Sequence, residues 1–336
     1  MDSFAPIIIP TLNRYDHFKR CVESLSANTF ADETDLIIGL DYPPSERYLE
    51  GYSKIKKYIE TIVGFKRVIV LSSTVNLNAY GNYTRLINYV RESGYKSFIF
   101  SEDDNEFSPN FLEYMNWALE EFEEDDSIYA VCGFKRIDVT GLKNNVYKYP
   151  KFSAWGYGQW IKRREKLDKF RDLDYLKKYL DRMSIWSVFT NEYRKGISII
   201  GMLKERAALE DNLPKFLPKN EMFCLFPAKS MVRNYGHDGL GIHGGTDKMR
   251  RLYENMEIDK DIHFIPRVVE DLYQPSLDDA YSKTYPINIK NVLKGKAEFF
   301  LYKATGFVID HKIFDPWYRV RLRRLSHFFV ERLSSL

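Results

Sequence analysis

Short apolar runs alternate with helical patterns over the first part of the chain. The runs are continuous and bounded by turn residues, which predicts buried strands at 7–11, 36–40, 67–71, 96–100 and 127–133. Between them, apolar residues recur every three or four positions, which predicts helices at 16–25, 83–90 and 108–122. Asp16 is expected to cap the first helix, and Ser108 with Pro109 to open the third. The predicted buried faces carry Phe18, Cys21, Val22 and Leu25 in the first helix and Phe111, Met115, Ala118, Leu119 and Phe122 in the third.

Strands of this kind, separated by helices, are typical of an α/β fold with a mostly parallel sheet covered by helices on both faces. Ligands of such sheets bind beyond the carboxyl ends of the strands. Asp41 follows the second strand, and Glu102, Asp103 and Asp104 follow the fourth, so these carboxylates are expected at that edge. No linker divides the first part of the chain, which predicts one domain at 1–265 and an appendage at 266–336.

The end of the chain has the pattern of a basic amphipathic helix. Tyr318, Leu322, Leu325, Phe329 and Leu333 fall on one face, and arginines lie largely away from it. Such a helix suits an anionic membrane surface. Packing against its own domain or a second subunit explains the same pattern, and the sequence leaves both open.

Charge and composition narrow the function classes. Lys and Arg number 50 and Asp and Glu 47, and this near balance does not favour a nucleic-acid partner. The 3 cysteines are far apart, which predicts free thiols in a reducing compartment. No apolar run is long enough to span a bilayer, and the first residues lack the pattern of a secretory signal, so a cytoplasmic location is expected.

The acidic run at 102–104 is the strongest local sign of chemistry, because it directly follows a predicted buried strand. Adjacent carboxylates repel each other unless a cation or hydrogen-bond donors compensate them. Hard divalent ions take oxygen ligands and commonly bridge a carboxylate to substrate phosphates. The run therefore predicts a site for a metal-bound nucleoside diphosphate. The similar run at 123–126 follows a helix and is expected to be a solvated turn.

Four blocks of sequence resemble GT-A glycosyltransferases, in particular the N-acetylglucosaminyltransferase I group and related bacterial surface-polysaccharide enzymes. They lie, in the family's order, at 10–14, at 98–111, at 154–160 and at 226–244. The resemblance implies a GT-A, Rossmann-like fold and a UDP-linked sugar donor. It also implies a divalent cation, Mn²⁺ or Mg²⁺.

The resemblance further implies roles for particular residues. Asp104 would bind the cation, with His243 as a second ligand on a loop that closes over the diphosphate; His237, six positions before it, is a weaker candidate for the same metal. Asp41 would contact the base and Asp103 the ribose. The other residues implied in nucleotide-sugar binding are Pro10, Thr11, Asn13, Arg14, Arg85, Glu102, Trp155 and Gly156. For Arg85, a structural role stays equally open.

Glu210 and Asp211 resemble the acidic pair that supplies the general base in inverting GT-A enzymes, with Asp211 favoured and Glu210 as substitute. A pair of charges at a helix end is the alternative explanation. A base opposite the leaving group implies inversion at the anomeric carbon. The expected acceptor is a hydroxyl of a glycan or lipid-linked oligosaccharide in bacterial surface-polysaccharide synthesis, reached at the cytoplasmic face of the membrane.

Three other functions compete with this hypothesis. The glycines at 239–244 match a dinucleotide-binding motif, but no βαβ unit is expected around them, which disfavours an oxidoreductase. A pyrophosphorylase would need a glycine-rich loop after the first strand, where residues 11–15 contain no glycine. A non-catalytic protein that binds nucleotide sugars with the same fold remains the main alternative.

Overall fold

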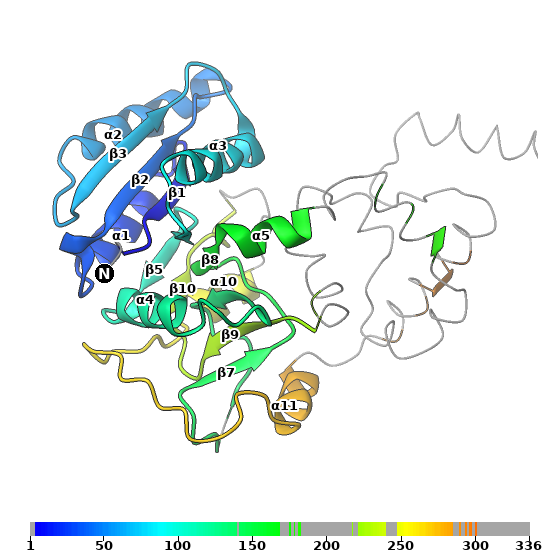
Figure 1. Ribbon diagram of the computed structural model, residues 1–336. Helices are drawn as coiled ribbons and strands as arrows, with labels where there is room; N and C mark the ends of the chain where they lie inside the picture. Colours follow the sequence, from blue (N-terminus) through cyan, green and yellow to red (C-terminus); the bar gives the residue numbers. More distant parts are fainter. Residues whose placement is uncertain are drawn as a thin grey trace, which may run out of the picture. The chain divides into compact units, whose positions relative to one another are not determined.

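The computed structural model describes residues 4–139, 141–168, 221–239 and 247–284, with single residues between and after these ranges. Contacts divide the chain into two compact units, Met1–Tyr175 with Glu205–Pro286, and Leu176–Lys204 with Ile287–Leu336. The helices and strands below belong to the first unit (Figure 1). The predicted tail helix at 317–336 lies outside the described residues, and the predicted boundary at residue 265 stays a prediction. Among the described helices, none combines the length and apolarity needed to cross a bilayer.

The first half of the sheet is parallel. Strands β1 (Ile7–Thr11), β2 (Asp35–Leu40), β3 (Arg67–Ser72) and β4 (Ser97–Phe100) lie in the order β3-β2-β1-β4, at the ranges predicted to within a residue. β1 and β2 are almost wholly buried, which explains their continuous apolar sequence, whereas β3 is a partly exposed edge.

Helices cover both faces of these strands (Figure 1). Helices α1 (Tyr15–Ser26) and α2 (Leu49–Ile59) share a core with Ile7, Ile9, Leu36 and Ile38 on one face. Helix α3 (Asn78–Glu92) packs on the other face, where the Leu86 side chain lies against Gly39. The predicted α/β fold with a doubly covered, mostly parallel sheet is confirmed.

The predicted helix faces are buried, but two predicted caps are wrong. Phe18, Cys21, Val22 and Leu25 of α1 are buried as expected. The N-cap of α1 is Arg14, because the Phe18 N–H donates to the Arg14 carbonyl, and Asp16 lies in the first turn.

Helix α4 (Phe111–Glu121) likewise has Asn110 as its N-cap. The Ser108 hydroxyl donates to the Asn110 side chain, and the Ser108 backbone carbonyl accepts a hydrogen bond from the Phe111 N–H. Ser108 therefore forms the turn before the helix and does not cap it. The apolar stripe of α4 is buried from Phe111 to Leu119 as predicted, but Phe122 lies past the end of the helix and is only partly buried.

The second half of the sheet is mixed. The predicted fifth strand, β6 (Ile128–Cys132), does not lie beside β4, because β8 (Tyr157–Trp160) inserts antiparallel to both. Strands β9 (Phe223–Pro227) and β7 (Val146–Tyr149) complete the order β3-β2-β1-β4-β8-β6-β9-β7. Gly158 brings β8 against α4, since a Cβ there would lie 3.1 Å from the Leu119 side chain.

A second, two-stranded sheet lies just past the end of β4. β5 (Asn105–Phe107) pairs antiparallel with β10 (Val232–Asn234), so that Asn234 faces Asn105. This pairing brings a segment from late in the chain onto the acidic run. The remaining described helices are α5 (Ile161–Asp168), α10 (Asp247–Glu254) and α11 (Ser276–Thr284), with single 3-10 turns at Ala31–Glu33 and Glu46–Tyr48.

Candidate active site

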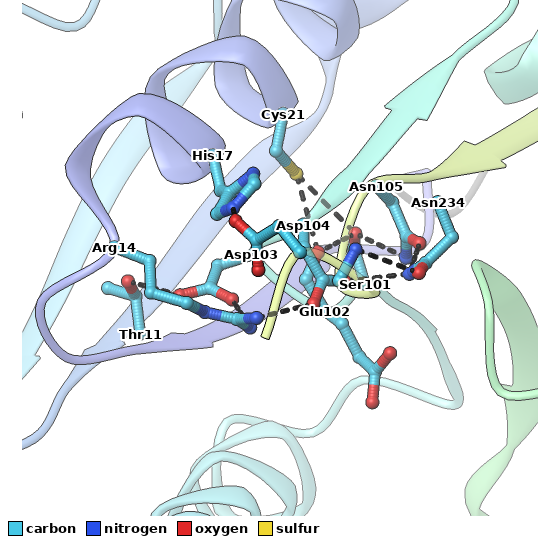
Figure 2. Close-up of polar contacts among 12 residues, drawn as sticks. Thr11, Arg14, His17, Cys21, Ser101, Glu102, Asp103, Asp104, Asn105 and Asn234 are labelled. Carbon is cyan, nitrogen blue, oxygen red and sulfur yellow. Dashed lines mark hydrogen bonds and ion pairs between the residues drawn. The ribbon is translucent and has the colours of Figure 1, made fainter. Parts of the chain in front are cut away.

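Two buried carboxylates lie at the carboxyl end of β4, where the sequence predicted them. The side chains of Asp103 and Asp104 are 6% and 7% exposed. Arg14, at the start of α1, forms an ion pair with both: one guanidinium nitrogen contacts an oxygen of Asp103, and the other donates to Asp104 Oδ2 over 2.6 Å (Figure 2). The Thr11 hydroxyl, at the end of β1, donates to the second oxygen of Asp103 over 2.9 Å.

The two-stranded sheet holds Asp104 from the other side. The Asn234 side-chain amide donates to Asp104 Oδ1 over 2.8 Å and to the Asn105 side chain over 3.0 Å (Figure 2). The Tyr235 N–H donates to the Asp104 carbonyl over 2.8 Å. Gly236 lies so close that a Cβ there would be 2.2 Å from Asp104 Oδ2. Each carboxylate oxygen of the pair thus has a hydrogen-bond donor.

Burial and charge act against each other in this cluster. Burial raises the pKa of Asp103, and the charge of Asp104 adds to that rise, while the Arg14 guanidinium opposes it. Burial would lower the pKa of Arg14, but both carboxylates raise it and keep the guanidinium charged. With both carboxylates ionised, the cluster has one more negative than positive charge.

The carboxylate oxygens of Asp103 and Asp104 suit a hard divalent cation that is bound together with phosphates. Such ions prefer oxygen ligands and are often held by only one or two protein carboxylates. Asp103 and Asp104 are the residues that would hold it. Within the described ranges, no group of three or more His, Cys, Asp or Glu side chains is arranged to hold a metal. Ligands beyond the two carboxylates would therefore come from a bound phosphate, from water or from residues outside those ranges.

Asp41 and Arg85 anchor the carboxyl ends of β2 and β3. Asp41 is buried, and its Oδ1 accepts the backbone N–H groups of Tyr42 and Leu77 over 2.9 and 2.8 Å. Arg85 donates to the carbonyl of Leu71 over 2.8 Å, and burial lowers its pKa. Both residues therefore have structural roles, and their predicted nucleotide contacts stay predictions.

Pro10 and Asn13 are neighbours of Thr11 and Arg14 in the chain, and Glu102 directly precedes Asp103. Pro10 is part of β1, and Asn13 lies in the turn before α1, where its carbonyl accepts the Tyr15 N–H. The Glu102 carbonyl accepts the Ser101 hydroxyl over 2.7 Å, which fixes the start of the acidic turn. The Asn13 contact shapes the turn that carries Arg14, and the Glu102 contact shapes the loop that carries Asp103 and Asp104.

Trp155 and Gly156 lie just before β8. The Trp155 ring packs edge-on against Phe134 and Tyr253, at centroid distances of 4.6 and 4.7 Å. His237 stacks on the same Tyr253 ring at 4.8 Å. Gly156 has a φ of +63°, and a Cβ there would lie 2.7 Å from the Phe107 ring. The tryptophan-glycine block thus joins the main sheet to the two-stranded sheet that holds Asp104.

Comparison with known proteins identifies the family of this chain. Residues 7–189, more than half of the chain, match the family described as "Glycosyl transferase family 2". The chain belongs to glycosyl transferase family 2. No curated protein matches this glycosyltransferase. The narrower resemblance to the N-acetylglucosaminyltransferase I group stays a prediction.

Solved structures resemble this glycosyltransferase at low identity. One is the mannosyltransferase PcManGT from Pyrobaculum calidifontis in complex with GDP-Man and Mn²⁺, with 12% identity, a TM-score of 0.35, and 48% of this chain and 46% of that chain covered. Another is residues 1–349 of S. aureus TarS, with 13% identity, a TM-score of 0.34, and 48% and 49% covered. The matched region is about half of each of those chains. At these values, the donor and metal of this glycosyltransferase must be argued from its own residues.

Several residues at the site of this glycosyltransferase were assigned no role from sequence. Asn234 and Gly236 contact the Asp104 side chain from a segment 130 and more positions later; both lie in the resembling block at 226–244, but no contact with Asp104 was assigned to them. His17 of α1 hydrogen-bonds Asp238 over 2.8 Å. Three predicted site residues, Glu210, Asp211 and His243, lie outside the described residues, so their roles stay predictions.

Proposed function

We propose that this family 2 glycosyltransferase moves a sugar, with inversion, from a nucleoside diphosphate donor to a hydroxyl group in a reaction that needs Mn²⁺ or Mg²⁺. The observation that carries the proposal is the buried Asp103–Asp104 pair at the carboxyl end of β4. This edge of the sheet is where open α/β folds bind their ligands. A buried pair of carboxylates with a net negative charge favours a cation there.

The donor would lie along the ends of β1, β2 and β4. Thr11 and Arg14 already contact the carboxylate pair, and Asp41 ends the neighbouring strand. A UDP-linked donor is proposed on the sequence resemblance. The cation, when bound, would stabilise the negative charge that develops on the leaving diphosphate. Asp104 would hold it, with Asp103 beside it and His243 as the proposed second ligand.

Asp211 is the proposed general base, with Glu210 as its substitute. A hydroxyl is a poor nucleophile until a positioned carboxylate takes its proton while the new bond forms. Attack from the face opposite the leaving diphosphate inverts the anomeric carbon. The anomeric configuration of the product, read by NMR, tests this directly, and retention would contradict a single base.

The proposed acceptor is a glycan or lipid-linked oligosaccharide in bacterial surface-polysaccharide synthesis. Support comes from the sequence resemblance and from the basic amphipathic pattern at 317–336, which suits a peripheral position at the cytoplasmic face of a membrane. Binding at the membrane would place the enzyme beside a lipid-linked substrate.

The proposal is tested by a screen of UDP- and GDP-linked sugars with and without Mn²⁺, read by melting temperature and by release of nucleoside diphosphate. A bound ligand must raise the melting temperature by mass action. Asp104→Ala is expected to abolish turnover and Mn²⁺-dependent nucleotide binding. Asp211→Asn is expected to lower turnover about 10²-fold or more while nucleotide binding is kept.

Asp32→Ala is the matched control, because it removes an exposed carboxylate that is distant in the chain from Asp103 and Asp104. It is expected to have the same turnover and nucleotide binding as the parent. If no nucleotide sugar raises the melting temperature with or without Mn²⁺, the proposed donor site is wrong. If Asp211→Asn turns over like the parent, another group is the base.

A further inference from the structure

We propose that Arg14 is an exchangeable counter-ion of the Asp103–Asp104 pair. In the unliganded chain its guanidinium occupies the pair, and when a divalent cation binds there Arg14 moves onto the diphosphate of the donor. The inference rests on the proposed function and adds a coupling between cation and donor that the family match does not assign.

The position of Arg14 is the position that a cation would need. One guanidinium nitrogen contacts Asp103, and the other lies 2.6 Å from Asp104 Oδ2. Oδ1 of Asp104 faces the other way, toward Asn234. A cation that reaches Oδ2 must therefore displace the guanidinium, because both cannot occupy the space between the two carboxylates.

Asn234, by contrast, is a fixed donor. Besides Asp104, its side chain contacts Asn105 over 3.0 Å and accepts the Gly236 N–H over 3.0 Å. Asn234 also lies in β10, which pairs with β5. These bonds hold Asp104 Oδ1 in place while the partner of Oδ2 changes.

Arg14 has the freedom that an exchange requires. Its side chain is 20% exposed, three times as exposed as the carboxylates that it contacts. In the described part of the chain, its guanidinium hydrogen bonds go to those two carboxylates alone. It is the N-cap residue of α1 and makes no capping bond with its side chain. Moving the guanidinium therefore breaks no hydrogen bond to any other described residue.

The charges link the cation to the donor. Two carboxylates and one guanidinium have a net charge of −1, and a divalent cation would change it to +1. A diphosphate brings at least two negative charges, which compensate both the cation and the released guanidinium. Each ligand therefore favours binding of the other, and this coupling must be reciprocal.

The test is Mn²⁺ binding, measured by the EPR signal of free Mn²⁺ for the full chain with and without UDP. The parent is expected to bind Mn²⁺ weakly alone and about tenfold or more tightly with UDP. Arg14→Gln removes the competing charge, so it is expected to bind Mn²⁺ alone about tenfold more tightly than the parent. It should also bind UDP more weakly and gain less from the second ligand.

Lys19→Gln is the control, because it removes one positive charge from the same helix at a side chain that is 43% exposed and pairs with Glu23. It is expected to match the parent. Arg14→Lys keeps the charge, but its single ammonium cannot contact both carboxylates as the guanidinium fork does. Arg14→Lys should therefore bind Mn²⁺ more tightly than the parent. It replaces Arg14→Gln in the test if thermal melting shows that Arg14→Gln does not fold.

Two results separate the possible failures. If the parent shows UDP-dependent Mn²⁺ binding but neither Arg14 variant binds Mn²⁺ alone more tightly, the exchange is wrong while the proposed function stands. If the parent binds no Mn²⁺ with either UDP or GDP, the proposed metal-dependent function fails, and the exchange fails with it.

Discussion

Gly236→Ala is the substitution that tests the geometry of the site most directly. The added Cβ would lie 2.2 Å from Asp104 Oδ2 and 2.9 Å from its Cγ. An ordinary contact between carbon and oxygen needs about 3.4 Å or more, so one of the two groups must move by about 1.2 Å. Gly236 does not have a positive φ, so alanine is compatible with its backbone. The expected damage is therefore a displaced carboxylate and not a strained chain.

A displacement of that size at the carboxylate proposed to bind the cation is large for catalysis. Misplacing a reacting group by about 1 Å costs about 10²-fold in rate. Gly236→Ala is expected to lower kcat/KM for the nucleotide sugar by about that factor and to weaken Mn²⁺ binding in the presence of nucleotide. The measurements are initial rates of nucleoside diphosphate release, a Mn²⁺ titration and thermal melting.

Gly81→Ala is the matched control. Gly81 lies inside α3, where a Cβ would meet the Leu77 side chain at 3.2 Å and no group of the site. Alanine is favoured over glycine in a helix by about 1 kcal/mol, so this variant should be at least as stable as the parent and equally active. If Gly236→Ala keeps the parent's rate and Mn²⁺ affinity, the close approach of Gly236 to Asp104 is refuted.

Three further predictions concern stability and membrane binding. Arg163 donates hydrogen bonds to the carbonyls of Ile128 and Phe122, and its guanidinium lies 3.6 Å from the centre of the Trp160 ring. Arg163→Met removes these contacts and should lower the free energy of unfolding by about 3 kcal/mol, measured by urea titration. Hydrogen bonds from Arg67 lower the pKa of the Asp35 carboxyl. The ionised carboxyl therefore stabilises the folded chain fully above the ordinary pKa of 3.8, and this contribution is lost as the pH falls through the lowered pKa. Arg67→Gln should therefore destabilise the chain at neutral pH, and by progressively less as the pH falls below 3.8, measured by urea titration at several pH values. Deleting residues 317–336 should reduce liposome binding in flotation and spare transfer to a soluble acceptor; unchanged flotation would remove the membrane argument.

Strands β1 to β4 and β6 and helices α1, α3 and α4 were predictable because each depends on nearby residues. The runs that form β1, β2 and β4 are mainly apolar, since these strands are buried on both faces. The Asp103–Asp104 pair was predictable for the same reason, because it directly follows a recognisable strand. The caps at Asp16 and Ser108 were predicted wrongly, since several polar residues compete near each helix start and only the backbone bonds decide among them.

The strands that the sequence did not reveal depend on distant partners. β8 contains Gly158 and Gln159 and no apolar run, so it has no strand signal of its own. It becomes a strand because β4 and β6 supply hydrogen bonds on both sides. β10 is three residues long and becomes recognisable only in its pairing with β5.

The sequence by itself determined the α/β class, the strand that ends at the acidic run, and the residue types that suit a cation and a diphosphate, because periodicity and adjacency are local properties. The tertiary structure alone decided what surrounds the carboxylates. Arg14 lies near Asp104 because β1 pairs with β4, and Asn234 and Gly236 lie near it because β10 pairs with β5. Charge balance in a buried site depends on which groups are within a few ångströms, and chain folding sets those distances.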